Sequence, residues 1–312
     1  MRAAPLVALP LFGALLFAAC AEEGPLPFER EQGGFDPVRY DAGTEPPLDG
    51  ALPDVVRFGI TPFYTAERQR RMLERMQRYL EDALGARVEP VIGDDYLASV
   101  EQLARGELDV AQLSPYACIV VEKRVPELDF VATAIAQGAS TYASYLVVRR
   151  DDAIVSVEDA RGKRLGLTER LSTSGYLYPR AWLKERGLDA ERDFQLSLHG
   201  QHDALLRALL AGEVDVAAIS SDTLVTHRAL GLGSPVRIIA KMGRIPYDCV
   251  VARRALPAAL KHRIRKAFLS LSIHSERGRF VLEDYNLING FMPIPEGHYD
   301  EVKKTAALAP LP

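Results

Sequence analysis

Apolar and polar positions alternate along this chain in a pattern typical of buried strands followed by amphipathic helices. Val55 to Ile60 form a short apolar run that Thr61-Pro62 ends, which predicts a strand. From about Ala66 to Leu84 apolar residues recur at helical spacing with Arg and Glu between them. Gly85 follows where a helix C-terminus favours a left-handed residue. The pattern therefore predicts a strand and then a surface helix.

Three further segments continue this order. Val88 to Ile92 and Leu108 to Leu113 are predicted strands, and Tyr96 to Ala104 is a predicted helix that Gly106 ends. Consecutive β-α-β-α-β elements need right-handed crossovers between strands. The segment therefore predicts an α/β fold with a mainly parallel sheet.

Three short sequence segments recur in similar form roughly 105 residues further along the chain, which indicates an internal repeat. The matching pairs are Arg57–Thr61 with Arg164–Thr168, Gly106–Ala111 with Gly212–Ala217, and Tyr145–Arg150 with Cys249–Arg254. Three matches in one order indicate two similar α/β lobes. Ligands of open α/β sheets bind beyond the carboxyl ends of the strands, so two facing lobes predict one shared cleft.

The repeat also predicts lobe boundaries. We expect lobe 1 over 55–148 and 245–312, and lobe 2 over 149–244. Two crossings between the lobes make a two-strand hinge that suits closure around a ligand. A helix over 263–271 is expected to pack on lobe 1, followed by an irregular tail from 285 to 310.

The N-terminus has the features of a secretory signal over residues 1–19. Its apolar segment is too short to span a bilayer comfortably, and small residues precede Cys20. This ending resembles a bacterial lipoprotein signal, which implies a lipid on Cys20 as the sole membrane anchor. Phe17 is large for that motif, so plain secretion after cleavage near Ala19 is the alternative. Residues 20–54 are rich in Gly, Pro and acids and predict a flexible tether of a periplasmic or extracytoplasmic protein.

Composition excludes one class of partner. The 312 residues carry a net charge of −4 with a pI near 5.9, and 26% of them are charged. Nucleic-acid-binding domains carry a basic stripe, which this sequence lacks. A hydrophobic content of 48% suits a soluble globular protein of two lobes.

The candidate chemistry centres on three hydroxyl side chains in a row. Ser172, Thr173 and Ser174 precede Gly175 and an apolar run over 177–183, directly after the first strand of lobe 2. Ser and Thr are favoured at helix N-caps, and a helix start offers N–H donors and a partial positive charge. Hydroxyls and amides without Lys or Arg suit a compact oxyanion. An ordinary capped helix is the alternative.

The repeat places further residues at the cleft edge. Tyr96 and His202 each open the second helix of their lobe, and Tyr116 and Asp222 each follow the third strand. Pro62 to Thr65 follow the first strand of lobe 1. Because the carboxyl ends of the strands face the cleft, all these positions are expected there.

Three motifs together resemble a known family. Ser172-Thr173-Ser174-Gly175-Tyr176, His202-Asp203-Ala204 and Ile245-Pro246-Tyr247-Asp248 resemble the phosphate/phosphite/phosphonate-binding proteins of ABC importers, and the resemblance extends from about Arg57 to Ala306. It implies the two-lobed type II periplasmic binding protein fold, a small oxyanion ligand, an ABC permease as partner and no cofactor.

The resemblance also implies residue roles. Hydroxyls and amides of 172–174 would grip the oxyanion, and Tyr96, Tyr142 and His202 would add donors. Asp222 and Asp248 would take a protonated ligand oxygen or an ammonium group, which selects among anions. Taken alone, the histidine and the acids are also compatible with caps or turns, and the tyrosines with packing at a lobe edge.

Two cysteines depart from the family pattern. Cys118 and Cys249 are both expected in lobe 1 near the cleft. They suit buried free thiols, a disulfide in an oxidising compartment, or, at Cys118, a ligand for a thiophilic oxyanion such as arsenite. The last option resembles a relative that senses arsenite beside a histidine kinase, so an oxyanion sensor with a kinase partner is the alternative function.

Enzymatic motifs are missing from the sequence. It has no Gly-x-Ser-x-Gly elbow, no metal-spaced His/Cys cluster, no phosphate loop and no dinucleotide fingerprint. Ser174 has no base and acid partners in triad order. The sequence therefore predicts a receptor that is not an enzyme and holds no metal.

Overall fold

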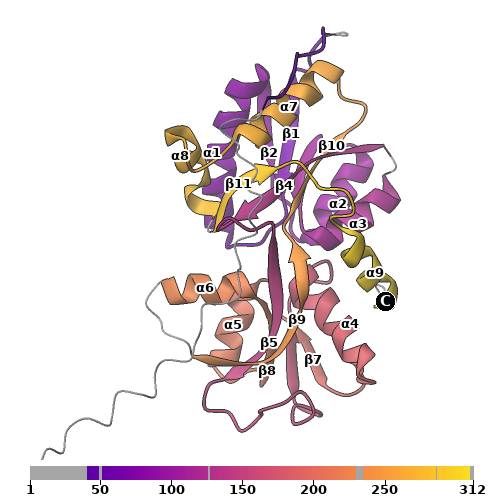
Figure 1. The fold of residues 1–312 in the computed structure, drawn as a ribbon, viewed down its shortest axis with the longest axis vertical. Helices are drawn as coiled ribbons and strands as arrows, with labels where there is room; N and C mark the ends of the chain where they lie inside the picture. The colour runs from indigo at the N-terminus through magenta and orange to yellow at the C-terminus, as the bar shows by residue number, and fades with distance from the viewer. Residues whose placement is uncertain (1–40, 49–50, 126, 230–234, 286, 310–312) are drawn as a thin grey trace, which may run out of the picture.

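Two β-sheets, each covered by helices, form two lobes stacked along the long axis of the molecule (Figure 1). The computed structural model describes residues 41–48, 51–125, 127–229, 235–285 and 287–309. The predicted signal peptide, the lipidation site Cys20 and most of the predicted tether lie outside the described residues.

Lobe 1 is built on a six-stranded sheet of order β11-β4-β10-β3-β1-β2. Its strands are β1 (Val55–Ile60), β2 (Arg87–Val91), β3 (Val110–Leu113), β4 (Leu128–Ala136), β10 (Cys249–Arg253) and β11 (Ile288–Met292). Its helices are α1 (Ala66–Leu84), α2 (Tyr96–Arg105), α3 (Pro115–Arg124), α7 (Ala258–Ser270), α8 (Glu276–Leu282), the 3₁₀ turn η3 (Glu283–Tyr285) and α9 (Asp300–Leu308).

Lobe 2 is built on a five-stranded sheet of order β7-β6-β8-β5-β9. Its strands are β5 (Thr141–Arg149), β6 (Arg164–Leu167), β7 (Gln195–Leu198), β8 (Val216–Ser220) and β9 (Val236–Pro246). Its helices are the π-helical turn η2 (Thr173–Leu177), α4 (Tyr178–Glu185), α5 (His202–Leu210) and α6 (Ser221–Ala229).

The predicted order of the first elements is confirmed, but the sheets are mixed rather than mainly parallel. The three strands that alternate with helices, β1 to β3 and β6 to β8, pair in parallel. The remaining strands, β4, β5, β9, β10 and β11, all pair antiparallel. Three of them, β9, β10 and β11, lie outside the β-α-β-α-β segments, and it was the alternation of strands and helices in those segments that predicted parallel pairing.

The predicted lobe boundary at 148/149 is wrong. β5 pairs with β8 and β9, so Thr141 to Arg149 belongs to lobe 2 and the first crossing lies between Ala136 and Thr141. β9 returns beside β5, and the second crossing occurs between Pro246 and Cys249. The repeat had matched β5 with β10 correctly, but each of these strands completes the sheet of its own lobe.

A matched pair of ion clusters supports the duplication. In lobe 1, Asp109 accepts the backbone N–H of Arg57 at 2.9 Å and lies 3.5 Å from the guanidinium of Arg253. In lobe 2, Asp215 accepts the backbone N–H of Arg164 at 3.1 Å and lies 3.6 Å from the guanidinium of Arg149. Asp109 thereby ties β1 to β10, and Asp215 ties β6 to β5, and in each pair the second strand follows a crossing between the lobes.

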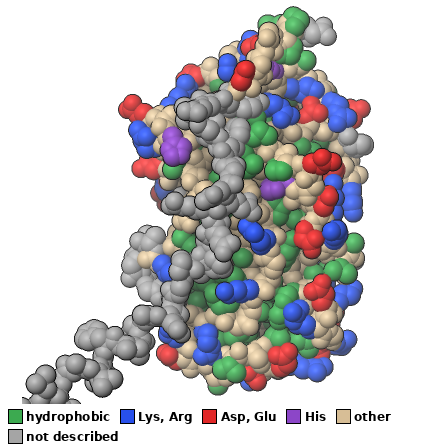
Figure 2. Space-filling model, viewed as in Figure 1, with side chains coloured by type: hydrophobic (Ala, Val, Ile, Leu, Met, Phe, Trp, Pro, Cys, Tyr) green, Lys and Arg blue, Asp and Glu red, His purple; other side chains and the backbone are tan. Residues whose placement is uncertain are grey.

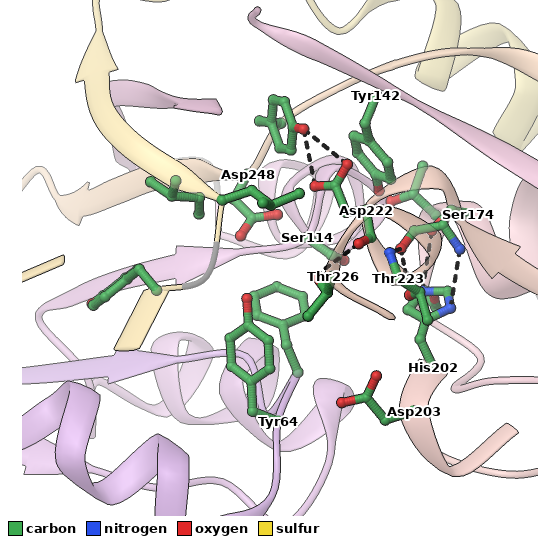
Figure 3. Close-up of a pocket in the computed structure, with 18 of the residues that line it drawn as sticks. Tyr64, Ser114, Tyr142, Ser174, His202, Asp203, Asp222, Thr223, Thr226 and Asp248 are labelled. Atoms are coloured by element: carbon green, nitrogen blue, oxygen red, sulfur yellow. Dashed lines mark hydrogen bonds between the residues drawn. The ribbon is translucent and has the colours of Figure 1, made fainter. Parts of the chain in front are cut away.

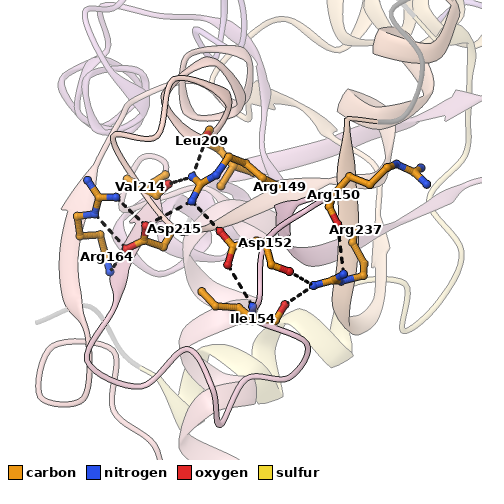
Figure 4. Close-up of polar contacts among 9 residues, drawn as sticks. All are labelled: Arg149, Arg150, Asp152, Ile154, Arg164, Leu209, Val214, Asp215 and Arg237. Carbon is orange, nitrogen blue, oxygen red and sulfur yellow. Dashed lines mark hydrogen bonds and ion pairs between the residues drawn. The ribbon is translucent and has the colours of Figure 1, made fainter.

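The lobe 2 cluster is the larger of the two (Figure 4). Arg149 donates to the backbone oxygens of Leu209 and Val214 at 3.0 and 2.8 Å, which fixes the end of α5 against β5. Two further bonds from the guanidinium of Arg164 reach Asp215. These bonds hold the pKa of Asp215 down at about 2, with a smaller contribution from the charge of Arg149.

The segment after 285 is not the irregular tail that was expected. It contributes the edge strand β11 and the helix α9, which packs between α3 of lobe 1 and α4 of lobe 2. Lys303 pairs with Glu122 of α3 at 3.0 Å, and Lys184 of α4 donates to the oxygen of Leu308 at 3.0 Å. The helix therefore bridges the two lobes beside the hinge (Figure 1).

The surface agrees with the mixed charge of the sequence. On the face in Figure 2, basic and acidic side chains are interspersed over both lobes. None of the helices in the described ranges is both long and apolar enough to cross a bilayer.

Candidate functional site

A cavity of about 110 Å³ lies between the lobes. One buried water needs roughly 10–15 Å³ on this measure, so the cavity has room for an oxyanion and a substituent. All eight predicted site residues line it, and they come from both lobes and from the hinge: Tyr96, Tyr142, Ser172, Thr173, Ser174, His202, Asp222 and Asp248. Figure 3 labels Tyr142, Ser174, His202, Asp222 and Asp248 among them.

The hydroxyl segment is held in a tight turn. The hydroxyl of Ser172 accepts the N–H of Gly175 at 3.1 Å, which is the expected N-cap bond. Gly175 in turn packs on Thr168, the residue that follows β6, where a Cβ would lie 2.0 Å from the threonine hydroxyl oxygen. Only glycine fits there. The first turn of a helix leaves N–H groups without intrahelical partners, and Thr173 and Ser174 begin that turn at the cavity wall.

Ser174 and His202 form a pair at the cavity wall (Figure 3). The Nδ1 atom of His202 accepts the backbone N–H of Ser220 at 3.3 Å, so Nδ1 carries no proton. Burial lowers the pKa of His202 to about 4, which keeps the ring neutral with its proton on Nε2. Nε2 lies 3.2 Å from the hydroxyl of Ser174 and donates to it. The hydroxyl hydrogen of Ser174 is not used by His202. It can be shared between Tyr142, with which Ser174 is hydrogen-bonded, and an anion in the cavity.

Thr173 joins the two lobes. Its hydroxyl accepts the backbone N–H of Tyr116, at the start of α3 in lobe 1, at 2.9 Å. Beside it, the hydroxyl of Ser114 donates to the backbone oxygen of Leu171 at 2.7 Å. The hydroxyl segment of lobe 2 thus docks directly on lobe 1, and the structure is that of a closed cleft.

Asp222 is enclosed by tyrosines. The hydroxyl of Tyr247 donates to its carboxylate at 2.9 Å, and the ring of Tyr247 stacks on Tyr142 with centroids 5.0 Å apart. Burial raises the pKa of Asp222 to about 6, although hydrogen bonds from Tyr247 and Ser221 oppose that shift. Burial also raises the pKa of Tyr142, so its phenol stays protonated.

Asp248 lies across the cavity from Ser174 (Figure 3). The amide nitrogen of Gln112 donates to its carboxylate at 3.0 Å. Burial raises the pKa of Asp248 to about 7, with a further contribution from the charge of Asp222. The two acids therefore gain protons readily in the closed cleft.

The remaining wall is aromatic. Tyr96 is buried at the start of α2 and packs edge-on against Phe63 with centroids 5.5 Å apart. Arg68 lies 3.9 Å above the ring of Tyr64 and donates to the backbone oxygen of Asp284. Among the described residues that line the cavity, Arg68 has the only Lys or Arg side chain. An anion at the hydroxyl segment would thus meet neutral donors.

The chain matches one family model over residues 58–299. That family is described as "ABC transporter, phosphonate, periplasmic substrate-binding protein". The chain belongs to this family. Its members are binding proteins that work outside the cytoplasm, so this phosphonate-binding family member is an extracytoplasmic component of an ABC importer system.

Individual relatives agree with that assignment. The phosphate-import protein PhnD of Mycolicibacterium smegmatis is 26% identical over 274 residues, which cover 81% of this chain and 85% of that protein. The phosphonates-binding periplasmic protein of Escherichia coli is 26% identical over 69% of this chain and 65% of its own length. PhnD1 of Prochlorococcus marinus, solved in complex with methylphosphonate, has the same fold with a TM-score of 0.74 and 17% identity, over 82% of this chain and 98% of that one. The predicted type II periplasmic binding fold is confirmed.

The structure corrects the metalloid hypothesis for this family member. Cys118 of α3 and Cys249 of β10 form a disulfide, with Cα atoms 6.5 Å apart and both side chains fully buried. Neither cysteine lines the cavity. A thiolate ligand at Cys118 therefore has no place in this site.

Sequence reasoning missed several lining residues. Ser114 and Ser220 occupy equivalent positions in the repeat, so the same argument that found Asp222 could have found both. Tyr247 lies inside a motif used for the resemblance. Gln112 and Tyr285 carry no local signal, because only the packing of distant segments brings them to the cavity.

Proposed function

We propose that this protein captures a phosphorus oxyanion, namely a phosphonate, phosphite or phosphate, in the inter-lobe cavity and delivers it to the ABC importer without transforming it. The observation that carries the proposal is the start of the η2–α4 helix: Ser172, Thr173 and Ser174 line the cavity there, and the hydroxyl of Ser174 is held by a neutral His202. Such an arrangement binds anions without a counter-cation.

Each residue has a stated role in the proposal. Ser174 donates its hydroxyl hydrogen to the anion, while His202 holds that hydroxyl in place. Ser172 fixes the turn through Gly175, and Thr173 adds its hydroxyl hydrogen while its oxygen stays bonded to lobe 1. Tyr96 and Tyr142 supply phenolic donors, since burial raises the pKa of both.

The two acids give selectivity. A carboxyl group with a raised pKa can share a proton with a P–OH group or accept hydrogen bonds from an ammonium group. A fully ionised inorganic oxyanion offers neither and is repelled. Asp222 and Asp248 therefore favour ligands that still carry a proton or an amine near the oxyanion.

Membrane attachment completes the proposal. A lipid on Cys20 would keep the protein at the membrane, and residues 20–54 would let it reach the permease. Replacing Cys20 with Ser is expected to release the mature protein into the soluble extracytoplasmic fraction. Continued membrane association of that variant would remove this part of the proposal.

Isothermal titration calorimetry with phosphonates tests the proposal. We expect Ser174→Ala to weaken binding by about 10-fold to 100-fold, the value of one hydrogen bond to a charged group. The double change Ser172→Ala with Thr173→Ala should abolish binding while the protein stays folded. Ser197→Ala is the matched control, because Ser197 forms a similar pair with His199, at 2.9 Å, outside the cavity. Unchanged affinity in the Ser174 and double variants would contradict the proposal.

A further inference from the structure

The cavity has a second region that the oxyanion site does not use. We call it the side pocket. Its walls come from lobe 1 alone: the loop after β1, helix α1 and the segment from η3 to β11. Helix α1 contacts η3, which brings these segments together beside the cavity. The side pocket is lined by Phe63, Tyr64, Met72, Tyr285, Leu287 and Ile288.

Tyr285 is the unusual member of this set. Its side chain is 1% exposed, and no described residue donates or accepts a hydrogen bond at its hydroxyl. Buried tyrosine hydroxyls normally have a partner, as that of Tyr79 does by donating to the oxygen of Ala267 at 2.6 Å. Tyr285 lines the cavity. Burial raises the pKa of Tyr285, and the charges of Tyr64 and Asp248 add to the shift, so its hydroxyl stays protonated.

Gln112, which lines the same cavity, also has a buried polar atom without a partner among the described residues. Gln112 is 1% exposed, and its amide nitrogen is occupied by Asp248, but its amide oxygen has no donor. An amide oxygen can only accept a hydrogen bond. A ligand group that satisfies it must therefore donate.

The walls and the two polar atoms together specify a substituent. Leu287, Ile288, Met72 and Phe63 suit methylene groups, while Tyr285 and Gln112 suit a polar group that carries hydrogen. Phosphate, phosphite and methylphosphonate have no group that extends beyond the oxyanion site, so they would leave both polar atoms unpaired. Unpaired buried polar groups weaken a complex.

We propose that the preferred ligand is a phosphonate whose alkyl substituent enters the side pocket and carries a hydroxyl or amino group that hydrogen-bonds to Tyr285. The same hydroxyl or amino group supplies the hydrogen that the amide oxygen of Gln112 accepts, because the methylene chain has none to donate. This inference rests on the proposed function, because the oxyanion site must first hold the phosphonate group.

Calorimetry with a matched ligand series tests it. The probes are methylphosphonate, propylphosphonate, 3-hydroxypropylphosphonate and 3-aminopropylphosphonate, together with the five-carbon hydroxy and amino homologues. We expect at least one hydroxy or amino ligand to bind about 10-fold more tightly than propylphosphonate, as one added hydrogen bond predicts. The comparison of the hydroxy with the amino ligand identifies which group is preferred.

Two variants isolate the side pocket. Tyr285→Phe removes only the hydroxyl and should abolish the preference while propylphosphonate binds as before. Ile288→Trp narrows the side pocket and should weaken the long ligands but not methylphosphonate. Tyr79→Phe, the matched control, removes a buried hydroxyl that does not line the cavity and should change no affinity.

The outcomes separate this inference from the proposed function. If methylphosphonate binds as tightly as every longer ligand, or if Tyr285→Phe leaves the preference intact, the side-pocket inference is wrong and the proposed function stands. If the wild-type protein binds no phosphonate at all, both are wrong. Thermal unfolding of each variant confirms that the lobes remain folded.

Discussion

The acids of the cleft predict that ligand affinity depends on pH. Asp248 lies in the wall of the closed cavity, where burial raises its pKa to about 7 from the ordinary 3.8. A group whose pKa is raised in the closed state stabilises that state when protonated, and this contribution is lost as pH rises through 7. For a phosphonate without an amine, binding should therefore tighten as the pH falls.

The size of the effect follows from the two pKa values. If the open cleft leaves Asp248 at its ordinary value, proton linkage makes the affinity roughly 20-fold higher at about pH 5.5 than at about pH 7.5, a difference of about 1.8 kcal/mol. Asp222, with a pKa of about 6, adds a smaller effect of the same sign. An ammonium group beside the acids stabilises their ionised forms, so a ligand that carries one should show a much weaker dependence.

The assay compares wild type with Asp248→Asn. Methylphosphonate affinity is measured by calorimetry at about pH 5.5, 6.5 and 7.5, and the ratio of the two proteins is taken at each pH to cancel the titration of the ligand itself. We expect that ratio to change roughly 20-fold across the range and 2-aminoethylphosphonate to reduce the change. A ratio that is constant with pH would refute the assignment of a raised pKa to Asp248.

Three further predictions concern the scaffold. Gly175→Ala should displace the hydroxyl turn, because the new Cβ overlaps Thr168. It should lower ligand affinity at least about 10-fold in calorimetry and the free energy of unfolding by about 1–3 kcal/mol in urea. Normal affinity would contradict the tight packing. Asp215→Asn should lower the free energy of unfolding by about 1–2 kcal/mol at neutral pH. The difference from wild type should disappear as pH falls from about 4 toward 2, because the arginines that lower the pKa of Asp215 stabilise only its ionised form. A loss that does not depend on pH would argue against the ion cluster. Removing the disulfide by Cys118→Ser with Cys249→Ser should lower the free energy of unfolding by about 2–4 kcal/mol. Arsenite should not shift the unfolding temperature of the wild-type protein. A shift with arsenite that the double variant loses would restore the metalloid hypothesis.

The hydroxyl segment was predictable because its signal is local. A run of hydroxyl residues, a glycine and an apolar helix specify a capped turn within a few residues of sequence. The repeat then placed His202 and Asp222 at the same edge. What the pattern could not supply is which hydroxyl does what: the oxygen of Thr173 is used by Tyr116 of the other lobe, a contact between segments that are far apart in the chain.

The lobe boundary failed for a related reason. The segment over 145–150 matches the segment over 249–254 because β5 and β10 occupy equivalent positions in their sheets, beside β8 and β3 respectively. Along the chain, however, β5 comes before the β6–β8 unit of lobe 2 and β10 comes after it. The repeat alone therefore assigned β5 to lobe 1. Periodicity identifies a strand but not its sheet, since the pairing partner is chosen by hydrogen bonds and packing at long range. The same limit hid Tyr285, which reaches the cavity only because α1 and η3 pack together.

The hydroxyl segment also explains how binding and closure depend on each other. On its inner side Ser174 faces the cavity and is fixed by His202, and on its outer side Leu171 and Thr173 bond to lobe 1. An anion at the helix start would hold the turn in the geometry that the outer contacts require. Lobe 1, once docked, holds the turn in the geometry that the anion requires. By linkage each event favours the other, so the closed state needs no cation across the cleft to be selected by an anionic ligand.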